Sequence, residues 1–378
     1  MRKSVLNIAV IYGGRSCENE ISVITGTMAA NVLDREKFRP FPVYLTQSGK
    51  FYTGDALFDL NTFSEGVEKK AQEAEFSGGK LYTIKGNKRK EIAKIDCAVN
   101  CCHGLCGEDG VVSAILDLNG IANASPDLFG SALFMDKAAT KLWAKSLGIN
   151  VLPYVKITED DYLHRTAFVR KFVKTKLGFP VIVKPSRQGS SIGVFVAEND
   201  EKLVFSLRAA FVYDSVVIVE KYLSERREIN CAAYRQGENI VLSECEEPKT
   251  DNAILTFSDK YLSDGGKERA STLPAKITEK QANTVKEYTR TLYKKSDLRG
   301  IVRADFLLSG DDVYFNEMNT VPGSLAYYLF CENLSGFSNL LALLIGQGIR
   351  DAEVRAGKKM LRNCGVLGKN SAAHGKRR

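Results

Sequence analysis

Residues 301–319 read IVRADFLLSGDDVYFNEMN. The runs IVRADFLL and VYFNEMN are rich in β-branched and aromatic residues, which favour strands. Between them, the residues SGDD at positions 309–312 are a strong turn signal. The stretch therefore predicts a β-hairpin that carries polar side chains among its apolar ones.

Four of these polar side chains are expected on one face of the hairpin. With an odd-numbered loop, Asp305 faces Glu317 and Arg303 faces Asn319, and alternation along each strand turns all four the same way. Two carboxylates directly opposite each other repel, and a divalent cation held by oxygen ligands would relieve the repulsion. The alternative is a solvated outer face of an edge hairpin, because antiparallel sheets often expose one face to water.

Length and composition indicate a globular protein of two or three domains. At 378 residues the chain is too long for one ordinary core, and it is 44% apolar and 26% charged. No apolar run approaches the ~20 residues that a membrane span needs, and the N-terminus lacks the pattern of a signal peptide. Nine cysteines scattered through a chain of this length are typical of reduced thiols. We therefore expect a cytoplasmic protein that does not bind membranes.

The charge distribution argues against a nucleic-acid partner. The formal net charge is +8, but residues 351–378 hold eight Lys/Arg and two Asp/Glu, so the first 350 residues carry only +2. A groove that binds nucleic acid needs a basic body. A short tail rich in Lys, Gly, Ala and Asn is instead typical of a frayed chain end.

Hydrophobic patterns predict an N-terminal α/β unit over residues 1–125. Three buried-type strands are expected at residues 6–14, 38–46 and 94–102. A helix at residues 18–34 follows the first strand, and this alternation predicts a parallel sheet.

Two further units are expected at residues 126–223 and 224–350, followed by the basic tail 351–378. The second begins with a helix at residues 131–148 and continues with the strands LPYVKI, FPVIVKPS and SVVIVEKYL. The third has strands near INCAAY and NIVLSECE, a helix at residues 278–296 and the hairpin. Its polar segment 250–270 lacks periodicity, which is typical of a lid.

The segment VIVKPSRQGSSIGV at residues 181–194 has the composition of a phosphate-binding loop. Lys184 stands at the end of an apolar strand and supplies a positive charge. Small residues follow, including Ser190 and Ser191, and let backbone N–H groups approach phosphate oxygens. No helix follows, so this is neither a Walker nor a Rossmann pattern. A plain glycine-rich hairpin is the alternative.

Two other lysine-containing motifs are ambiguous when each is taken singly. In VIVEKYL, Glu220 and Lys221 stand at a strand end and could read an adenine edge. An exposed ion pair is the alternative there. Lys137, in the helical segment FMDK, is equally open.

The segment NCCHGLCGEDG at residues 100–110 has two interpretations. Its three cysteines and His103 have the atoms for zinc, but adjacent cysteines at a strand end point opposite ways and no second Cys/His pair stands at finger-like spacing. The alternative is a loop at the carboxyl end of a parallel strand, where α/β folds bind ligands. Glu18 follows the first strand at the same sheet edge, which predicts that Glu18 and His103 share one crevice.

Eight stretches taken in order resemble the D-alanine–D-alanine ligases of the ATP-grasp superfamily. They are GGRSCENEIS, HGLCGEDG, MDKAATK, VIVKPSRQGSSIGV, VEKYL, SDKYLSD, VRADF and NEMNTVPG, and they span roughly residues 6–330. The resemblance implies α/β and α+β architecture, with the N-terminal parallel α/β domain followed by a two-part ATP-grasp fold that clamps ATP.

The resemblance also implies a reaction and its cofactors. An ATP-dependent ligase of this family converts one D-alanine to an acyl phosphate, which the amine of a second D-alanine attacks, for peptidoglycan precursor synthesis. ATP and Mg²⁺ (or Mn²⁺) are the implied cofactors, and a homodimer is expected.

The roles implied for individual residues fall into four groups. The metal ligands are Asp305, Glu317 and Asn319. The ATP-binding residues are Lys137, Lys184, Ser191, Glu220, Lys221, Leu223 and Glu228. The catalytic residues are Glu18, His103, Ser190, Tyr261, Arg303 and Gly323. The residues that bind the amino acids are Glu18, Lys260 and Tyr328.

Two departures from the family pattern concern ribose and acceptor binding. One extra residue separates Glu220 from Glu228, and Tyr328 stands where the family offers a small hydroxyl residue. A ligase that joins D-alanine to D-serine or to another D-amino acid is therefore the alternative. A nucleotide-binding protein without catalysis is the hypothesis from a different class, and the intact set of charged site residues argues against it.

Overall fold

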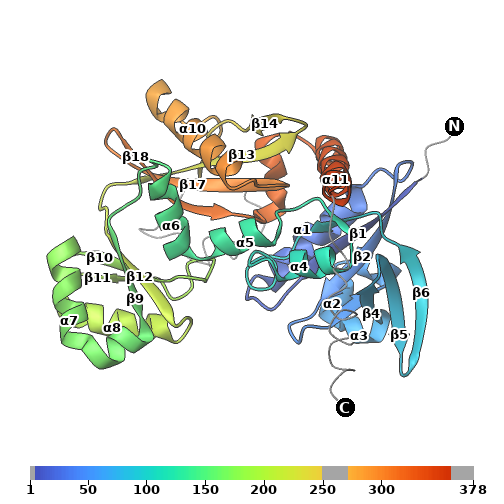
Figure 1. The fold of residues 1–378 in the computed structure, drawn as a ribbon, viewed down its shortest axis with the longest axis horizontal. Coiled ribbons are helices and arrows are strands. Elements are labelled where there is room, and N and C mark those ends of the chain that lie inside the picture. The colour runs from blue at the N-terminus through green and yellow to red at the C-terminus, as the bar shows by residue number, and fades with distance from the viewer. Residues whose placement is uncertain (1–4, 249–270, 359–378) are drawn as a thin grey trace, which may run out of the picture.

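The structure is a computed structural model that describes residues 5–248 and 271–358. Three sheets with their helices form the molecule, and Figure 1 shows the N-terminal and central sheets on opposite sides with the C-terminal sheet between them at the top of the view. A two-stranded ribbon, β15 (Glu247–Pro248) and β16 (Ser271–Thr272), accompanies the C-terminal sheet.

The N-terminal sheet has eight strands in the order β6-β5-β4-β3-β2-β1-β7-β8. Its parallel half confirms the three predicted strands. It consists of β2 (Phe38–Leu45), β1 (Leu6–Gly13), β7 (Cys97–Asn100) and β8 (Ala122–Asn123). Strand β1 is apolar at almost every position because both faces of the sheet are covered. Helix α1 (Asn19–Val32) packs on one face and α4 (Val111–Leu118) on the other.

The antiparallel half of this sheet comes from a region that the sequence patterns left unassigned. Its strands are β3 (Phe51–Thr53), β4 (Gln72–Ser77), β5 (Lys80–Lys85) and β6 (Lys88–Lys94). Short helices connect β3 to β4, namely η1 (Asp55–Phe58), α2 (Asn61–Glu65) and α3 (Val67–Lys70). Edge strand β6 is rich in exposed Lys and Arg, which discourage pairing with another chain.

The central sheet is antiparallel, in the order β11-β10-β12-β9. The predicted strands are confirmed as β9 (Tyr154–Thr158), β10 (Val181–Pro185) and β12 (Val216–Lys221), with the short β11 (Phe195–Ala197). Two helices that the sequence patterns did not predict, α7 (Glu159–Leu177) and α8 (Asp200–Phe211), bury their apolar stripes against this sheet.

The C-terminal sheet has the order β14-β13-β17-β18 and contains the predicted hairpin. Its strands are β13 (Arg227–Gln236), β14 (Asn239–Leu242), β17 (Ile301–Ser309) and β18 (Asp312–Asn319). The predicted helix at residues 278–296 is α10 (Glu279–Lys295), and a capping box of Thr278 and Gln281 begins it. The turn η2 (Gly323–Leu329) and helix α11 (Leu334–Ala356) follow the hairpin.

The single helix expected at residues 131–148 is wrong, because the chain forms two helices there. Helix α5 (Leu128–Met135) ends at Asp136, whose backbone is extended, and α6 (Lys137–Ser146) begins directly after it. The Asp136 carboxylate accepts hydrogen bonds from the N–H groups of Ala138 and Ala139 and so caps α6. The break places Lys137 at the first position of the new helix.

The expected domain boundaries at residues 125, 223 and 350 stay predictions. Helices α5 and α6 contribute Phe134 and Ala144 to the core under the C-terminal sheet. Helix α11 continues through position 351 to Ala356, inside the segment expected as a tail.

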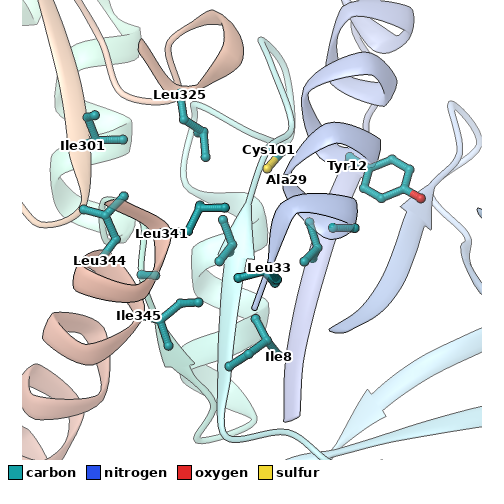
Figure 2. Close-up of a cluster of buried hydrophobic side chains, with 14 of the residues drawn as sticks. Ile8, Tyr12, Ala29, Leu33, Cys101, Ile301, Leu325, Leu341, Leu344 and Ile345 are labelled. Atoms are coloured by element: carbon teal, nitrogen blue, oxygen red, sulfur yellow. The ribbon is translucent and has the colours of Figure 1, made fainter. Parts of the chain in front are cut away.

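One apolar core joins the N-terminal and C-terminal units through helix α11. Leu341, Leu344 and Ile345 of α11 pack with Ile8 of β1 on one side and Ile301 of β17 on the other (Figure 2). All five are buried. Each apolar side chain of this size contributes about 1.5–3 kcal/mol when it leaves water, so the two units are held together by burial rather than by surface contacts.

No single helix of the described residues is long and apolar enough to cross a membrane. The pair formed by η2 and α11 reaches that length and composition together but is bent by 111°. Its buried apolar side chains, such as Leu325 and Leu341, belong to the core that α11 shares with the N-terminal sheet.

Leu341→Ala should lower the free energy of unfolding by about 2–5 kcal/mol, because it opens a cavity where Leu341 is 0% exposed. Denaturant unfolding measures the loss. Leu343→Ala removes the same atoms from the same helix at a position that is 38% exposed. It should cost about 1 kcal/mol or less, and equal losses in both variants would contradict the shared core.

Candidate active site

A β-bulge in the hairpin β17–β18 brings four polar residues to one face. The loop has two residues rather than the expected odd number, since Ser309 pairs with Asp312. The register shifts beyond Phe306, so that Asp305 faces Glu317 and Arg303 faces Asn319. The predicted pairs are therefore confirmed, but the bulge produces them and the loop does not.

Asp305 is the centre of a charged network on this face. The Arg303 guanidinium donates to both of its carboxylate oxygens, Nε to Oδ1 at 2.7 Å and Nη2 to Oδ2 at 2.8 Å. Asn319 Nδ2 donates to Oδ2 at 2.8 Å. Burial alone would lower the pKa of Arg303, but the Asp305 carboxylate outweighs burial and raises that pKa well above its ordinary value. The guanidinium is thus a fixed positive charge.

Lys137 reaches the same face from the start of α6. Its backbone N–H donates to the Ser186 carbonyl at 2.9 Å, which ties α6 to the end of β10. Its Nζ donates to the Gln188 carbonyl at 2.6 Å and lies 3.4 Å from Glu317 Oε2. The broken helix therefore positions an ammonium group between the glycine-rich loop and the hairpin.

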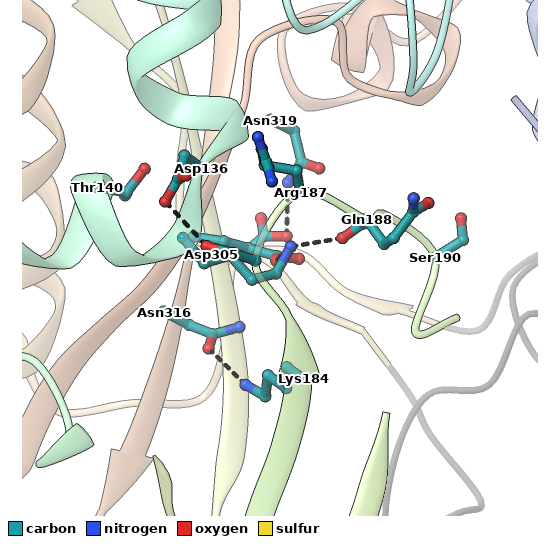
Figure 3. A network of polar contacts seen from close by, with 12 residues as sticks. Asp136, Thr140, Lys184, Arg187, Gln188, Ser190, Asp305, Asn316 and Asn319 are labelled. Carbon is teal, nitrogen blue, oxygen red and sulfur yellow. Dashed lines mark hydrogen bonds and ion pairs between the residues drawn. The ribbon is translucent and has the colours of Figure 1, made fainter. Parts of the chain in front are cut away.

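Lys184 and Glu220 form a buried ion-pair cluster with Lys141. Lys184 Nζ and Lys141 Nζ each lie 2.6 Å from one Glu220 carboxylate oxygen. Figure 3 shows that Lys184 Nζ also donates to Asn316 Oδ1, at a distance of 3.4 Å. Burial opposes ionisation of Glu220, but the two lysines outweigh it and lower its pKa to about 2. Glu220 is therefore not the exposed ion-pair partner that was the alternative at this strand end, because its side chain is 0% exposed.

Three of the other residues expected at the nucleotide lie where the chain passes from β12 to β13. Lys221 is exposed at the end of β12, and Leu223 and Glu228 are half-buried. The Leu223 carbonyl accepts a hydrogen bond from Arg226 Nη1 at 3.0 Å. Ser191 lies in the loop between β10 and β11 and has a left-handed backbone, with φ of 58°.

Glu18 and the His103 loop lie against each other, as the common sheet edge predicted. Ser190 Oγ donates to Glu18 Oε1, and Ser16 Oγ donates to the His103 carbonyl at 2.7 Å. A Cβ at Gly104 would lie 2.9 Å from Glu18 Oε2. Only glycine therefore allows the loop to approach this carboxylate so closely.

His103 is buried and held at both ring nitrogens. Nδ1 lies 2.7 Å from the Val321 carbonyl and Nε2 lies 3.1 Å from Thr25 Oγ1. Burial lowers the pKa of His103. Burial therefore favours the neutral form of the ring.

The zinc interpretation of the cysteine motif does not fit this arrangement. Cys101 and Cys102 are both buried and belong to cores on opposite faces of the sheet. Among residues 5–248 and 271–358, no three His, Cys, Asp or Glu side chains form a group that could hold a metal. Any metal site on the hairpin would therefore take no more than two carboxylates from the described protein residues.

Two of the remaining expected site residues are described and two are not. Gly323 and Tyr328 are half-buried in the turn that follows the hairpin. Lys260 and Tyr261 lie outside the described residues.

Four residues of the site were not assigned from the sequence: Thr25, Glu108, Lys141 and Asn316. Glu108 belongs to the motif HGLCGEDG, so its motif was a signal. Lys141 stands one helical turn after Lys137, which could have indicated a second lysine on the same side of the helix. The signal for Asn316 was the step of three residues between Phe315 and Met318, where regular alternation along a strand would give two.

Glu220→Gln should lower the free energy of unfolding by about 3–5 kcal/mol at neutral pH, because it leaves two lysines without their buried partner. Because the pKa of Glu220 is lowered on folding, the wild-type advantage exists above the unfolded pKa of about 4.3. It is lost as the pH falls toward the folded value of about 2. Denaturant unfolding across this pH range measures it.

The double variant Lys141→Met/Glu220→Gln should recover part of the lost stability, because it removes a buried charge together with its partner. Glu225→Gln makes the same change at an exposed position and is the control. An equal effect of the single variants at positions 220 and 225 would contradict the cluster.

Family models match both parts of the chain. Residues 7–125 match the model described as D-ala D-ala ligase N-terminus, and residues 142–345 match D-ala D-ala ligase C-terminus. A protein from Thermosipho melanesiensis named D-alanine--D-alanine ligase is 36% identical over 350 residues, which cover 91% of this chain and 94% of that protein. One from Campylobacter lari with the same name is 35% identical over 334 residues, covering 88% and 91%.

Solved structures agree with this match. The D-Alanine-D-Alanine Ligase from Helicobacter pylori aligns with a TM-score of 0.74 at 28% identity and covers 91% of this chain and 98% of its own. VanG D-Ala:D-Ser Ligase from Enterococcus faecalis aligns with a TM-score of 0.77 at 26% identity, covering 91% and 100%.

Proposed function

The chain belongs to the D-alanine–D-alanine ligase family, and we propose that it joins two D-alanines with conversion of ATP to ADP and phosphate, for peptidoglycan precursor synthesis. One observation carries the proposal beyond family membership. Lys137, Arg303, Asp305 and Glu317 converge on one face from separate elements, with Lys184 nearby. A protein that only held a nucleotide would not need the guanidinium fixed beside two facing carboxylates.

The lysines suit the transfer of a phosphoryl group to a carboxylate. A carboxylate oxygen becomes a leaving group only after it takes the γ-phosphoryl group, and the negative charge on the phosphates must be neutralised as this happens. We assign that work to Lys137 and Lys184, which are held near the hairpin by Glu317 and Asn316. Glu220 would orient Lys184 and border the adenine, with Lys221, Leu223 and Glu228 around the nucleoside and Ser191 over the phosphates.

The hairpin residues fit a magnesium ion. Mg²⁺ is usually bound by one or two protein carboxylates, with waters and substrate phosphates as its other ligands. Asp305 and Glu317 face each other across the strands and Asn319 hydrogen-bonds to Asp305, so two carboxylates and an amide oxygen are available. When bound, Mg²⁺ (or Mn²⁺) would neutralise the phosphates and orient them.

The residues around Glu18 suit the binding of the two amino acids. Glu18, oriented by Ser190, would accept the ammonium group of the first D-alanine, and His103 would lie beside the reacting atoms. When the second amine attacks the acyl phosphate, the oxyanion needs donors already in place. Arg303 and the Gly323 N–H would supply them.

The carboxylate of the second amino acid would be bound by Tyr328 and Lys260. Tyr261 would link the segment 250–270 to Glu18. Lys260 and Tyr261 lie outside the described residues, so their roles rest on the family resemblance alone.

The remaining parts of the proposal concern the oligomeric state, the location and the partners of the protein. We propose a homodimer in the cytoplasm, with small-molecule substrates and no nucleic acid partner. Sedimentation velocity of the purified chain checks the first point, and a monomer at micromolar concentration would contradict it.

The central test is ADP release from Mg-ATP with a panel of acceptors beside D-alanine. We expect ADP and D-alanyl-D-alanine in equal amounts. If D-serine is the preferred acceptor, the D-alanine–D-serine alternative replaces this assignment, and Tyr328 is the first residue to examine. ATP turnover that no D-amino acid stimulates would overturn the ligase function.

Glu317→Gln should fold normally and lose ligation by about 1,000-fold or more, because a bound metal supplies several kcal/mol of charge stabilisation. Steady-state kinetics over a magnesium titration measures the loss. Asp311→Asn removes one charge from the exposed tip of the same hairpin and is the control. Full activity of Glu317→Gln with an unchanged magnesium requirement would refute the metal site.

A further inference from the structure

Glu108 links two loops that lie far apart in the sequence. Its Oε2 accepts the Gly104 N–H at 3.0 Å, and its Oε1 accepts the Val321 N–H at 3.0 Å. Thr320 Oγ1 also donates to the Glu108 carbonyl at 3.3 Å. One residue thus fastens the His103 loop of the N-terminal unit to the segment that leaves the hairpin.

Val321 receives contacts from both Glu108 and His103. While its N–H donates to Glu108, its carbonyl lies 2.7 Å from His103 Nδ1. Thr25 of α1 completes a closed network of contacts, because Thr25 Oγ1 lies 3.1 Å from His103 Nε2 and accepts the Ser324 N–H at 3.2 Å. The imidazole and the 321–324 backbone therefore hold each other in one position.

This network of hydrogen bonds determines the tautomer of His103. The Val321 carbonyl can only accept, so Nδ1 carries the proton. Nε2 of the neutral ring then has only a lone pair, so the Thr25 hydroxyl donates to it while its oxygen accepts the Ser324 N–H. This assignment follows from the hydrogen-bond partners, as for any histidine whose hydrogens are not observed.

We infer that Glu108 is a positioning residue for the ligation. Its carboxylate sets the position and the tautomer of His103, and it also sets the position of the backbone that presents the Gly323 N–H. The inference rests on the proposed function, in which His103 lies beside the reacting atoms and Gly323 donates to the oxyanion. Only Pro322 separates Val321 from Gly323. A shift of the Val321 amide is therefore passed directly to the proposed oxyanion donor.

The position needs a carboxylate and not merely a polar side chain. Two backbone N–H donors require two acceptors, and glutamine would present its NH₂ group to one of them. Burial, and after it the negative charges of Glu18 and Glu317, raise the pKa of Glu108 to about 7, although the two N–H donors oppose the rise. Ionising Glu108 close to Glu18 and Glu317 costs free energy. The hydrogen bonds that its carboxylate accepts fix the geometry of the two loops and offset this cost.

The test compares Glu108→Gln with Asp109→Asn in the full-length protein at about pH 8, above the pKa of Glu108. Asp109 accepts two backbone N–H bonds within the same loop, from Cys106 and Val111, and has no such bond to residues 320–324. Both variants should lose similar stability. Only Glu108→Gln should lower kcat, by about 10–100-fold, with the KM for ATP changed by less than about threefold.

A spectroscopic signature separates positioning from a merely structural role. The chain has three histidines, so ¹⁵N labelling of histidine gives few signals, and their shifts report which ring nitrogen is protonated. Wild-type protein and Asp109→Asn should both show the Nδ1–H form for His103. Glu108→Gln should show a mixture of tautomers.

Three outcomes decide the inference. A wild-type kcat and an unchanged His103 signal in Glu108→Gln would overturn it, as would an equal loss of kcat in Asp109→Asn. If Glu108→Gln does not fold, Glu108→Asp replaces it under the same criteria, because aspartate keeps two acceptors on a shorter side chain. Failure of the proposed function is distinguishable, since wild-type protein would then form no dipeptide at all.

Discussion

The facing carboxylates of Asp305 and Glu317 are the constraint on which the site depends, and the bulge in β18 creates them. With a two-residue loop and no bulge, the pairing of Ser309 with Asp312 would continue unchanged and Glu317 would stand opposite Ala304. Ala304 is fully buried in the core under the C-terminal sheet. Because a shift of one residue turns every side chain to the other face, Glu317 would then point into that core. The extra residue, Asn316, moves it to the site and itself contacts Lys184.

Charge balance explains the rest of the site. Each cation that would meet the phosphates or the oxyanion already has a protein anion: Lys137 has Glu317, Lys184 has Glu220 and Arg303 has Asp305. These partners hold the cations in place before substrate binds, which is the arrangement that electrostatic catalysis requires. Glu220 and Lys141 are both buried, so this pair cannot relax into water, and it fixes β12 and α6 relative to each other.

The sequence predicted many of the elements because these depend on local signals, whereas most of the proposed site residues rest on the family resemblance. Apolar runs marked β1, β2 and β10, and alternation marked the face of the hairpin. It did not predict the features that depend on contacts between distant residues or on irregular backbone. The bulge at Asn316 leaves only one mark in the hydrophobic pattern, a step of three residues from Phe315 to Met318, and the break at Asp136 stands within an otherwise helical run. The bond from Glu108 to Val321 joins residues 213 positions apart, which no local pattern records.

The apolar core that helix α11 shares with the N-terminal and C-terminal units explains why contacts between these two units can be precise. His103 follows a strand of the N-terminal sheet, whereas Arg303 belongs to the C-terminal sheet, so their relative position depends on how the two units pack. Helix α11 buries side chains against both, which makes the interface part of the interior, and close-packed interiors resist displacement. Glu108 acts on this rigid base: the core sets the two loops at the right distance, and its carboxylate then fixes the orientation of their backbones. A change in α11 that loosened the core should therefore disturb His103 even though it touches no site residue, because the bonds of Glu108 are short and cannot follow a displaced unit.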